Sequence, residues 1–161
     1  MADPPACNAS PLIILGRAGQ LDLLRAVYGT VVVLDAVAAE VLGGPAGDAA
    51  AIALQTEGWF LRARVPEVPA AVAAWDLGPG ESEVLAWGLA HPGSEVILDD
   101  RLGRRCGRTL GIPVRGTVGI VVLAKQQGVI PVAGSVLDAL RGAGLFITAE
   151  LHERALRLVG E

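Results

Sequence analysis

The stretch Glu95-Val-Ile-Leu-Asp-Asp100 is a short apolar run that leads directly into two carboxylates. An apolar run without polar alternation predicts a β-strand buried on both faces, as in a parallel sheet. In open α/β sheets, ligands gather outside the carboxyl ends of such strands. The same pattern stands near the beginning of the chain, where Ala6-Cys7-Asn8 leads into a helix-like apolar run from Leu12. We therefore expect two strand ends that carry oxygen ligands.

Strand-like and helix-like segments alternate along most of the chain. Apolar and β-branched runs predict strands at 30–34, 59–65, 96–98 and 113–115. Helical spacing and end signals predict helices at 12–18, 20–28, 36–42, 48–57, 81–90, 101–110, 117–127, 135–141 and 149–158. Asp35 is the expected N-cap of the helix at 36–42, and residues 66–77 fit neither period. This order predicts an α/β fold with a parallel, doubly wound sheet.

The composition fits one α/β domain that spans residues 1–161. Of its 161 residues, 52% are hydrophobic, which is enough for a core of ordinary size. A formal charge of -4 argues against a general basic surface that coats nucleic acid. Cys7 and Cys106 lack metal-site spacing and are expected to be reduced core thiols. No basic residue precedes the first apolar run and no run is long enough for a bilayer, so we expect a cytoplasmic protein without membrane segments.

Two glutamates are predicted to project toward the sheet. Glu81 shares a helix face with Val84 and Leu85, and Glu40 lies on the apolar face of its own helix. A buried carboxylate requires a partner, because an unpaired buried charge is costly. Each residue also has a plainer interpretation. Glu81 stands in a first helical turn, where it favours the macrodipole, and Glu40 could be exposed or paired with an arginine.

The adjacent carboxylates of Asp99 and Asp100 repel each other unless a cation lies nearby. One of them can be explained as the N-cap of the helix at 101–110. Oxygen ligands, without clustered His or Cys, indicate Mg²⁺ or Mn²⁺ and not zinc. The chemistry that such an ion supports is phosphodiester hydrolysis, because it activates water and stabilises charge that develops on phosphate.

Arginines form a row on the helix that follows these carboxylates. Four of them stand at i, i+3, i+4 and i+7 and so share one face: Arg101, Arg104, Arg105 and Arg108. Guanidinium groups bind phosphate in a bidentate manner, so this row would orient a phosphodiester across the metal. The packing face of the helix is predicted to consist of Leu102, Cys106 and Leu110. The alternative is a solvated face whose charge offsets the carboxylates.

In its motifs and their order, the chain resembles PIN-domain proteins. The matching segments are Asn8-Ala-Ser-Pro-Leu-Ile13, Gly80-Glu81 at a helix start, Leu98-Asp-Asp-Arg101 followed by Arg104-Arg105, Gly116-Thr117-Val-Gly119, and Ala124-Lys125 with Gly128-Val-Ile130. This resemblance covers nearly the whole chain and implies a three-layer α/β/α sandwich with a central parallel sheet. It also implies a ribonuclease that depends on Mg²⁺ or Mn²⁺, acts on RNA, forms a homodimer and pairs with an antitoxin protein in a type II toxin-antitoxin system.

The resemblance assigns roles to individual residues. The metal-binding positions of the family fall on Asn8, Glu40, Glu81 and Asp99, with Asp100 as a substitute or helper, and the catalytic ones on Glu40, Glu81 and Asp99. The candidates for substrate binding are Ser10, Arg101, Arg104, Arg105 and Thr117. The departure is Asn8, where PIN nucleases generally have Asp. An amide oxygen still ligates a hard cation but adds no charge, so a non-catalytic PIN-like binding module stands as the alternative function.

Two other phosphate-binding classes do not fit the chain. A phosphorylation receiver domain has its acidic pair at the end of the first strand, whereas Asp99 and Asp100 follow a late strand. A dinucleotide or nucleotide site would require GxGxxG after a strand, or a P-loop, and the chain has neither. His91 and His152 have no metal spacing and are expected on the surface. The apolar helices around Ile120 and Leu137 are candidate surfaces for the homodimer.

Overall fold

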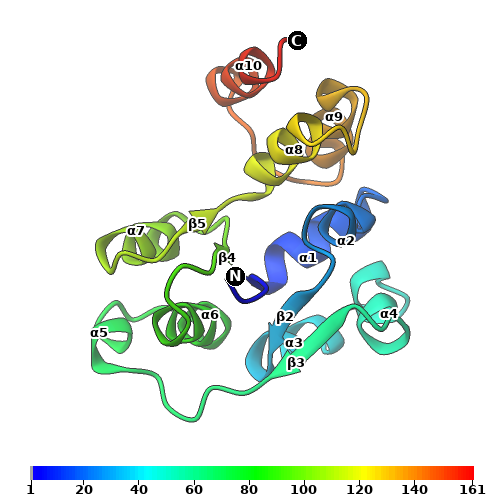
Figure 1. The fold of residues 1–161 in the computed structure, drawn as a ribbon. Coiled ribbons are helices and arrows are strands. Elements are labelled where there is room, and N and C mark those ends of the chain that lie inside the picture. Colours follow the sequence, from blue (N-terminus) through cyan, green and yellow to red (C-terminus); the bar gives the residue numbers. More distant parts are fainter. Residues whose placement is uncertain (1) are drawn as a thin grey trace.

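The computed structural model describes residues 2–161 (Figure 1). Its strands are β1 (Ala6–Cys7), β2 (Val31–Leu34), β3 (Phe60–Ala63), β4 (Val96–Ile97) and β5 (Val114–Arg115). Its helices are α1 (Ala9–Arg17), α2 (Asp22–Tyr28), α3 (Asp35–Leu42), α4 (Ala49–Thr56), α5 (Ala70–Ala73), α6 (Pro79–Ala90), α7 (Arg101–Thr109), α8 (Thr117–Gln126), α9 (Ala133–Gly142) and α10 (Ala149–Leu158). The predicted alternation of strands and helices is confirmed.

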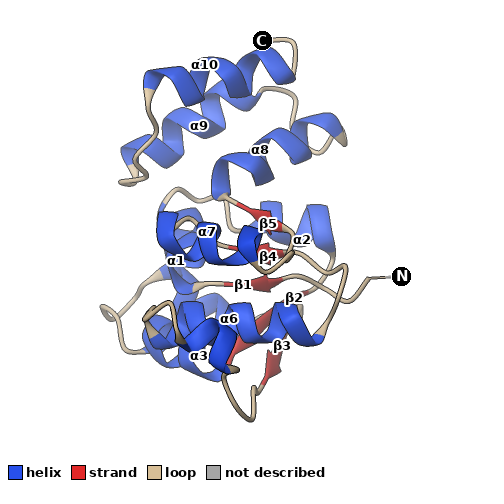
Figure 2. Ribbon diagram, turned by 90° about the vertical axis from the view of Figure 1, so that its left-hand side faces the viewer, coloured by secondary structure: helices blue, strands red, loops and turns tan. Residues whose placement is uncertain are grey.

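The strands form one parallel sheet in the order β3-β2-β1-β4-β5. The chain moves outward from β1 through β2 to β3, and then returns to the other side of β1 to form β4 and β5. The strand order therefore reverses between β1 and β4. Helices flank the sheet (Figure 2), so the predicted α/β/α sandwich is confirmed. Strands β1, β2 and β4 are buried along their length, as their unbroken apolar sequences require.

Glycines allow two helices to approach the sheet closely. Helix α6 packs on β1, β2 and β4, and α7 packs on β5. A Cβ atom at position 88 of α6 would lie 2.9 Å from Val96 Cγ1, and one at position 107 of α7 would lie 2.4 Å from Val114 Cγ2. Only glycine fits these positions without a shift of the neighbouring side chains. Gly88 and Gly107 thus allow α6 and α7 to pack closely against the sheet.

The last three helices pack on one another at one end of the molecule (Figure 1). Helix α8 also contacts α2, and α9 contacts α1. The carboxylate of Glu161 accepts hydrogen bonds from the backbone N–H groups of Ala133 at 2.6 Å and Gly134 at 3.1 Å, and these bonds lower its pKa. Glu161 therefore caps the N-terminus of α9. Ile120 and Leu137 are fully buried here, so these side chains form core and not an exposed dimer surface.

Several local predictions require correction. Asp35 is the first residue of α3 and not its N-cap, and the backbone N–H of Ala36 donates instead to Glu83 Oε2 at 2.9 Å. Helix α5 occupies part of the segment that fits neither period. His91 is half-buried, because its ring stacks on Trp87 with centroids 4.1 Å apart, and His152 is half-buried as well. Neither histidine is an ordinary surface residue.

Both cysteines of the chain lie in the core. Cys7 and Cys106 are buried free thiols, as expected. Burial raises the pKa of both thiols, and the negative charge of Asp99 adds to the effect at Cys7. Both are therefore protonated at neutral pH and contribute to packing.

In the part of the chain that the structure describes, no helix has the length and apolar character needed to cross a membrane.

Candidate active site

The two predicted strand ends meet where the strand order reverses. Asn8 follows β1 and Asp99 lies just beyond β4, and these strands are neighbours in the sheet. The backbone N–H of Asn8 donates to the carbonyl oxygen of Ile97 at 3.0 Å, which fixes the register at this edge. Ligands of open α/β sheets bind in the crevice outside the carboxyl ends of the strands at such a reversal. The fold therefore brings Asn8 and Asp99 to the position that favours a ligand.

Asn8 and Glu40 direct side-chain oxygens toward the same point. Asn8 is only 4% exposed, and its Oδ1 is buried without a hydrogen-bond donor among the described residues. A Cβ atom at Gly80, in the first turn of α6, would lie 3.0 Å from Asn8 Oδ1 and 3.6 Å from Glu40 Oε2. Glycine at this position leaves room for both oxygens. A buried carbonyl oxygen without a donor is unfavourable, and a cation or a water molecule at this point would satisfy it.

Asp99 is held by the N-terminus of α8. Its Oδ1 accepts a hydrogen bond from the backbone N–H of Thr117 at 2.8 Å, and its Oδ2 accepts one from Thr117 Oγ1 at 2.5 Å. The two bonds fix the orientation of the carboxylate at the N-terminus of α8. Thr117 is fully buried. Its hydroxyl, a predicted substrate contact, is engaged with Asp99 and serves to position that carboxylate.

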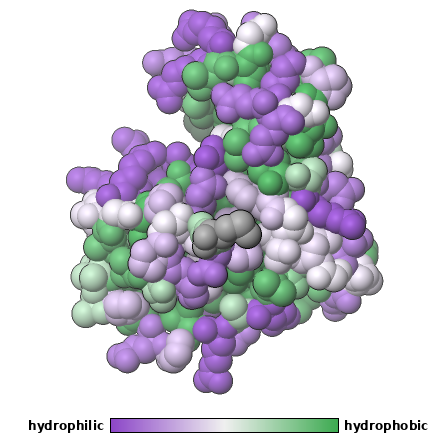
Figure 3. Space-filling view, viewed as in Figure 1, coloured by the Kyte–Doolittle hydropathy of each residue, from purple (hydrophilic) through white to green (hydrophobic). Residues whose placement is uncertain are grey.

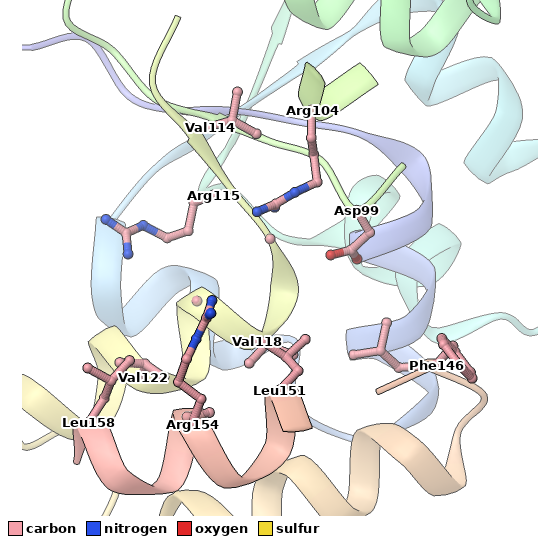
Figure 4. A pocket seen from close by; sticks show the side chains of 14 residues that line it. Asp99, Arg104, Val114, Arg115, Val118, Val122, Phe146, Leu151, Arg154 and Leu158 are labelled. Carbon is pink, nitrogen blue, oxygen red and sulfur yellow. The ribbon is translucent and has the colours of Figure 1, made fainter. Parts of the chain in front are cut away.

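Arg104 faces Asp99 across Gly116. A Cβ atom at Gly116 would lie 2.5 Å from Arg104 Nη1 and 3.1 Å from Asp99 Oδ1, so both groups border the same space. Figure 4 shows these two side chains at one side of a pocket. Arg104 Nη1 also donates to the carbonyl oxygen of Leu98 at 3.0 Å. Burial lowers the pKa of Arg104, the nearby Arg108 lowers it further, and Asp99 opposes the change. The guanidinium remains charged at neutral pH.

Helix α7 differs in part from its predicted faces. Arg101, Arg105 and Arg108 are exposed, whereas Arg104 is half-buried beside Asp99. Leu102, a predicted packing residue, is 45% exposed. The buried positions of the helix are Gly103, Cys106 and Gly107. Leu102 lies outside the face that these three residues form, so it does not pack against the sheet.

Four candidate residues have structural roles or lie on the surface. Asp100 Oδ2 accepts from the backbone N–H of Gly103 at 2.7 Å and is the N-cap of α7, as the plainer interpretation predicts. Glu81 is half-buried in the first turn of α6, where its plainer interpretation places it, and its Oε2 would lie 2.7 Å from a Cβ atom at Gly78, the N-cap of that helix. Glu40 is exposed, as its own plainer interpretation predicts. Ser10 is exposed on α1. Within residues 2–161, no three His, Cys, Asp or Glu side chains are close enough to hold a metal ion together.

The structure therefore groups the candidate residues in two sets. Asn8 and Glu40 approach Gly80, and Asp99 contacts Thr117 and faces Arg104. The Asn8 set fits a hard divalent cation, since it offers one amide oxygen without a donor and one carboxylate oxygen. The Asp99 set fits a phosphate group, since it offers a fixed guanidinium.

A cavity of about 430 Å³ adjoins the Asp99 set. Its lining comes from the ends of β4 and β5, from α7 and α8, and from the C-terminal segment (Figure 4). The residues that matter most for its character are Asp99, Arg104, Gly116, Phe146, Arg154 and Leu158. Phe146 and Arg154 were not predicted as site residues. No local pattern in the sequence connects them to Asp99, because they are about 50 positions away in the chain and approach it only in the fold.

A family model described as a PIN domain matches residues 5–161. The match runs from the start of the sheet to the end of the chain and includes both sets of candidate residues. No curated protein and no solved structure gives a significant match.

Proposed function

The chain belongs to the PIN-domain family, and from this premise we propose that it is a divalent-metal-dependent endoribonuclease that hydrolyses RNA phosphodiester bonds. PIN domains are generally nucleases and usually use divalent metal ions. They often pair with antitoxins, so we include in the proposal that the protein is the toxin of a type II toxin-antitoxin pair. In this proposal residues 1–161 form one domain that acts in the cytoplasm and assembles as a homodimer.

The buried Oδ1 of Asn8 is the observation that carries the proposal. It has no donor among the described residues and lies on the same side as Glu40 Oε2, at the carboxyl edge of the sheet. These are the oxygen types that Mg²⁺ and Mn²⁺ prefer. We assign Asn8 and Glu40 to the ion. Glu81, Asp99 and Asp100, which the family resemblance adds as ligands, do not form one cluster with them in this structure, and Asp99 borders the space that Arg104 offers to the phosphate. When bound, such an ion activates water and neutralises charge on the phosphate.

The residues of the chain itself hold and orient the RNA. Arg104 is braced by the carbonyl oxygen of Leu98 and faces Asp99, so its guanidinium is ready to donate to a phosphate next to that carboxylate. Arg101 and Arg105 are exposed on the same helix and attract the RNA backbone. Thr117 prevents the Asp99 carboxylate from rotating, because it donates to both carboxylate oxygens. Ser10, at the start of α1, is the remaining candidate for a backbone contact.

A second function, a non-catalytic binding module, is favoured by two observations. Asn8 contributes no negative charge, and the described residues include no group of three ionisable metal ligands. A site with fewer charges holds divalent cations less tightly. Under this alternative, Asn8→Asp creates or strongly increases RNA cleavage with Mn²⁺. If Asn8→Asp folds but cleaves no RNA, Asn8 is not the reason that the chain lacks activity.

The test is cleavage of a mixed RNA pool by the purified chain with Mn²⁺, with Mg²⁺ and with chelator. We expect cleavage with either metal, none with chelator, and a loss of at least about 100-fold in Asp99→Asn, in the range seen when a group that stabilises a transition state is removed. Asn keeps the shape of Asp and one acceptor for Thr117, so the fold should persist. The matched control is Asp138→Asn, which is exposed on α9 and should cleave like the wild type. Equal rates in Asp99→Asn and the wild type would contradict the proposal.

A further inference from the structure

Two large apolar side chains are exposed at the cavity beside Asp99. Phe146 is 86% exposed and Leu158 is 62% exposed, and both line this cavity. Single exposed apolar residues are common on proteins, but these two lie at opposite ends of one cavity (Figure 4), and exposed apolar groups that line a hollow indicate a binding surface. Figure 3 shows a hollow between the end formed by the C-terminal helices and the rest of the molecule. The cavity therefore has an apolar component that the hydrolytic site does not require.

The cavity combines this apolar component with cationic groups on opposite sides. Figure 4 shows Arg104 on the α7 side and Arg154 on the α10 side, with their guanidinium groups directed toward the same space and with Val118 and Leu151 beside Arg154. Phe146 lies at the side of the cavity nearer to Asp99. A volume of about 430 Å³ lies within the range of pockets that enclose a small organic ligand. One nucleotide unit is therefore of a suitable size.

Arg154 gives the cavity an uncompensated positive charge. Arg115 forms an ion pair with Glu95 at 2.6 Å, and Arg104 faces Asp99. Within residues 2–161, by contrast, no carboxylate forms an ion pair with Arg154. The ligand that complements this cavity has an anionic part for Arg154 and a flat apolar part for Phe146. A purely apolar segment would leave the charge of Arg154 unpaired and desolvated.

We propose that this cavity binds one unstacked nucleotide of a single-stranded RNA, with its base stacked on Phe146 and its phosphate in contact with Arg154. The proposal rests on the proposed function, because the cavity begins at Asp99 and thereby positions the neighbouring phosphodiester at the hydrolytic site. Proteins that recognise single-stranded RNA hold splayed bases on aromatic rings and pair the backbone with arginine. Phe146 is thus a positioning residue that selects unpaired RNA over duplex RNA.

The experiment measures binding without cleavage. Fluorescence anisotropy of a labelled single-stranded hexaribonucleotide is followed with the full chain in chelator. We expect Phe146→Ala to weaken binding roughly 5- to 150-fold, which is the effect of losing one stacked base. Phe146→Trp should retain the affinity, because it keeps an aromatic face. The matched control is Ile52→Ala, a side chain that is 50% exposed on α4 and should have no effect. Since Phe146 is so exposed, its removal does not disturb the core.

A second variant tests the phosphate contact. Arg154→Gln should weaken binding and reduce the slope of log affinity against log salt by about 0.7, as expected when one contact to a single strand is lost. The wild type should bind a duplex of the same sequence less tightly than the single strand. The duplex should bind to Phe146→Ala and to the wild type with equal affinity. An unchanged salt slope in Arg154→Gln would overturn the assignment of the phosphate.

The outcomes separate this inference from the proposed function. RNA binding that needs Phe146, without metal-dependent cleavage, would support the nucleotide site and contradict the nuclease. Metal-dependent cleavage with equal RNA affinity in wild type and Phe146→Ala would overturn the nucleotide site and leave the nuclease. If Phe146→Ala instead converts a dimer to a monomer in sedimentation and leaves RNA affinity unchanged, the surface joins two copies of the chain and the proposal is wrong. A wild type that binds no single-stranded RNA also overturns it.

Discussion

Asn8→Asp is expected to make the stability of the chain depend on a divalent ion. Asn8 is almost fully buried and its Oδ1 has no donor among the described residues, so the new carboxylate receives no hydrogen bond there. The carboxylate of Glu40 approaches the same point at Gly80. Burial and the like charge both disfavour ionisation and should raise the pKa of the new carboxyl toward neutrality. This costs roughly 3 kcal/mol at pH 7, which for a chain of this length lowers the melting temperature by about 6–12 °C in chelator.

Mn²⁺ should reverse most of this loss. An ion at about 100 times its Kd stabilises the folded state by about 2.7 kcal/mol, and an added carboxylate ligand strengthens its binding. The assay is thermal unfolding, followed by circular dichroism, in chelator and in MnCl₂. The control is Gln55→Glu, which adds the same charge at an exposed position on α4 and should change stability by less than about 0.5 kcal/mol in either buffer.

Two results would refute the reasoning about Asn8. If Asn8→Asp melts at the wild-type temperature in chelator, the new carboxylate is not buried without hydrogen-bond donors beside Glu40. If Mn²⁺ raises the melting temperatures of Asn8→Asp and Gln55→Glu by the same amount, the ion does not bind at Asn8.

Two further variants test the hydrogen bonds and the ion pair around the sheet edge. Thr117→Val keeps the side-chain volume but removes the 2.5 Å bond to Asp99 Oδ2, so urea unfolding should show a loss of about 1.5–3 kcal/mol. Burial alone would raise the pKa of Glu95, but hydrogen bonds from Arg115 and Tyr28 outweigh it and hold this pKa below its ordinary value of 4.5. The carboxylate therefore stabilises the fold above pH 4.5 and loses this effect as the pH falls through the lowered pKa, and Glu95→Gln should flatten the unfolding free energy against pH in that range.

Matched controls separate these effects from general destabilisation. Thr109→Val removes an exposed hydroxyl at the end of α7 and should leave the urea midpoint nearly unchanged. Glu153→Gln removes an exposed carboxylate of α10 and should keep the acid dependence of the wild type. A Thr117→Val protein as stable as Thr109→Val would contradict the role of Thr117, and an acid profile shared by Glu95→Gln and the wild type would contradict that of Glu95.

Much of the fold could be predicted from local sequence. The strand at β2 and the helices α4, α6 and α7 have boundaries close to those predicted, because burial on both faces, helical spacing and capping residues act over a few positions. Asp100 and Asp48 are N-caps, and each bonds to a backbone N–H two or three residues later. Asp35 has the same local pattern and is not a cap, since Glu83 from α6 supplies the acceptor. A hydrogen bond between α3 and α6 thus takes the place of the predicted cap by Asp35.

For the candidate site, the sequence by itself determined which chemical groups were available and that two of them follow the ends of strands. Only the tertiary structure decided how they are grouped. It left the Oδ1 of Asn8 buried beside Glu40, bound Asp99 to Thr117, and brought Phe146 and Arg154 to the cavity that begins at Asp99. The physical reason is range: propensity and capping depend on neighbours in the chain, whereas burial and hydrogen bonds between distant segments depend on how closely the helices pack against the sheet, which glycines such as Gly80 and Gly107 allow.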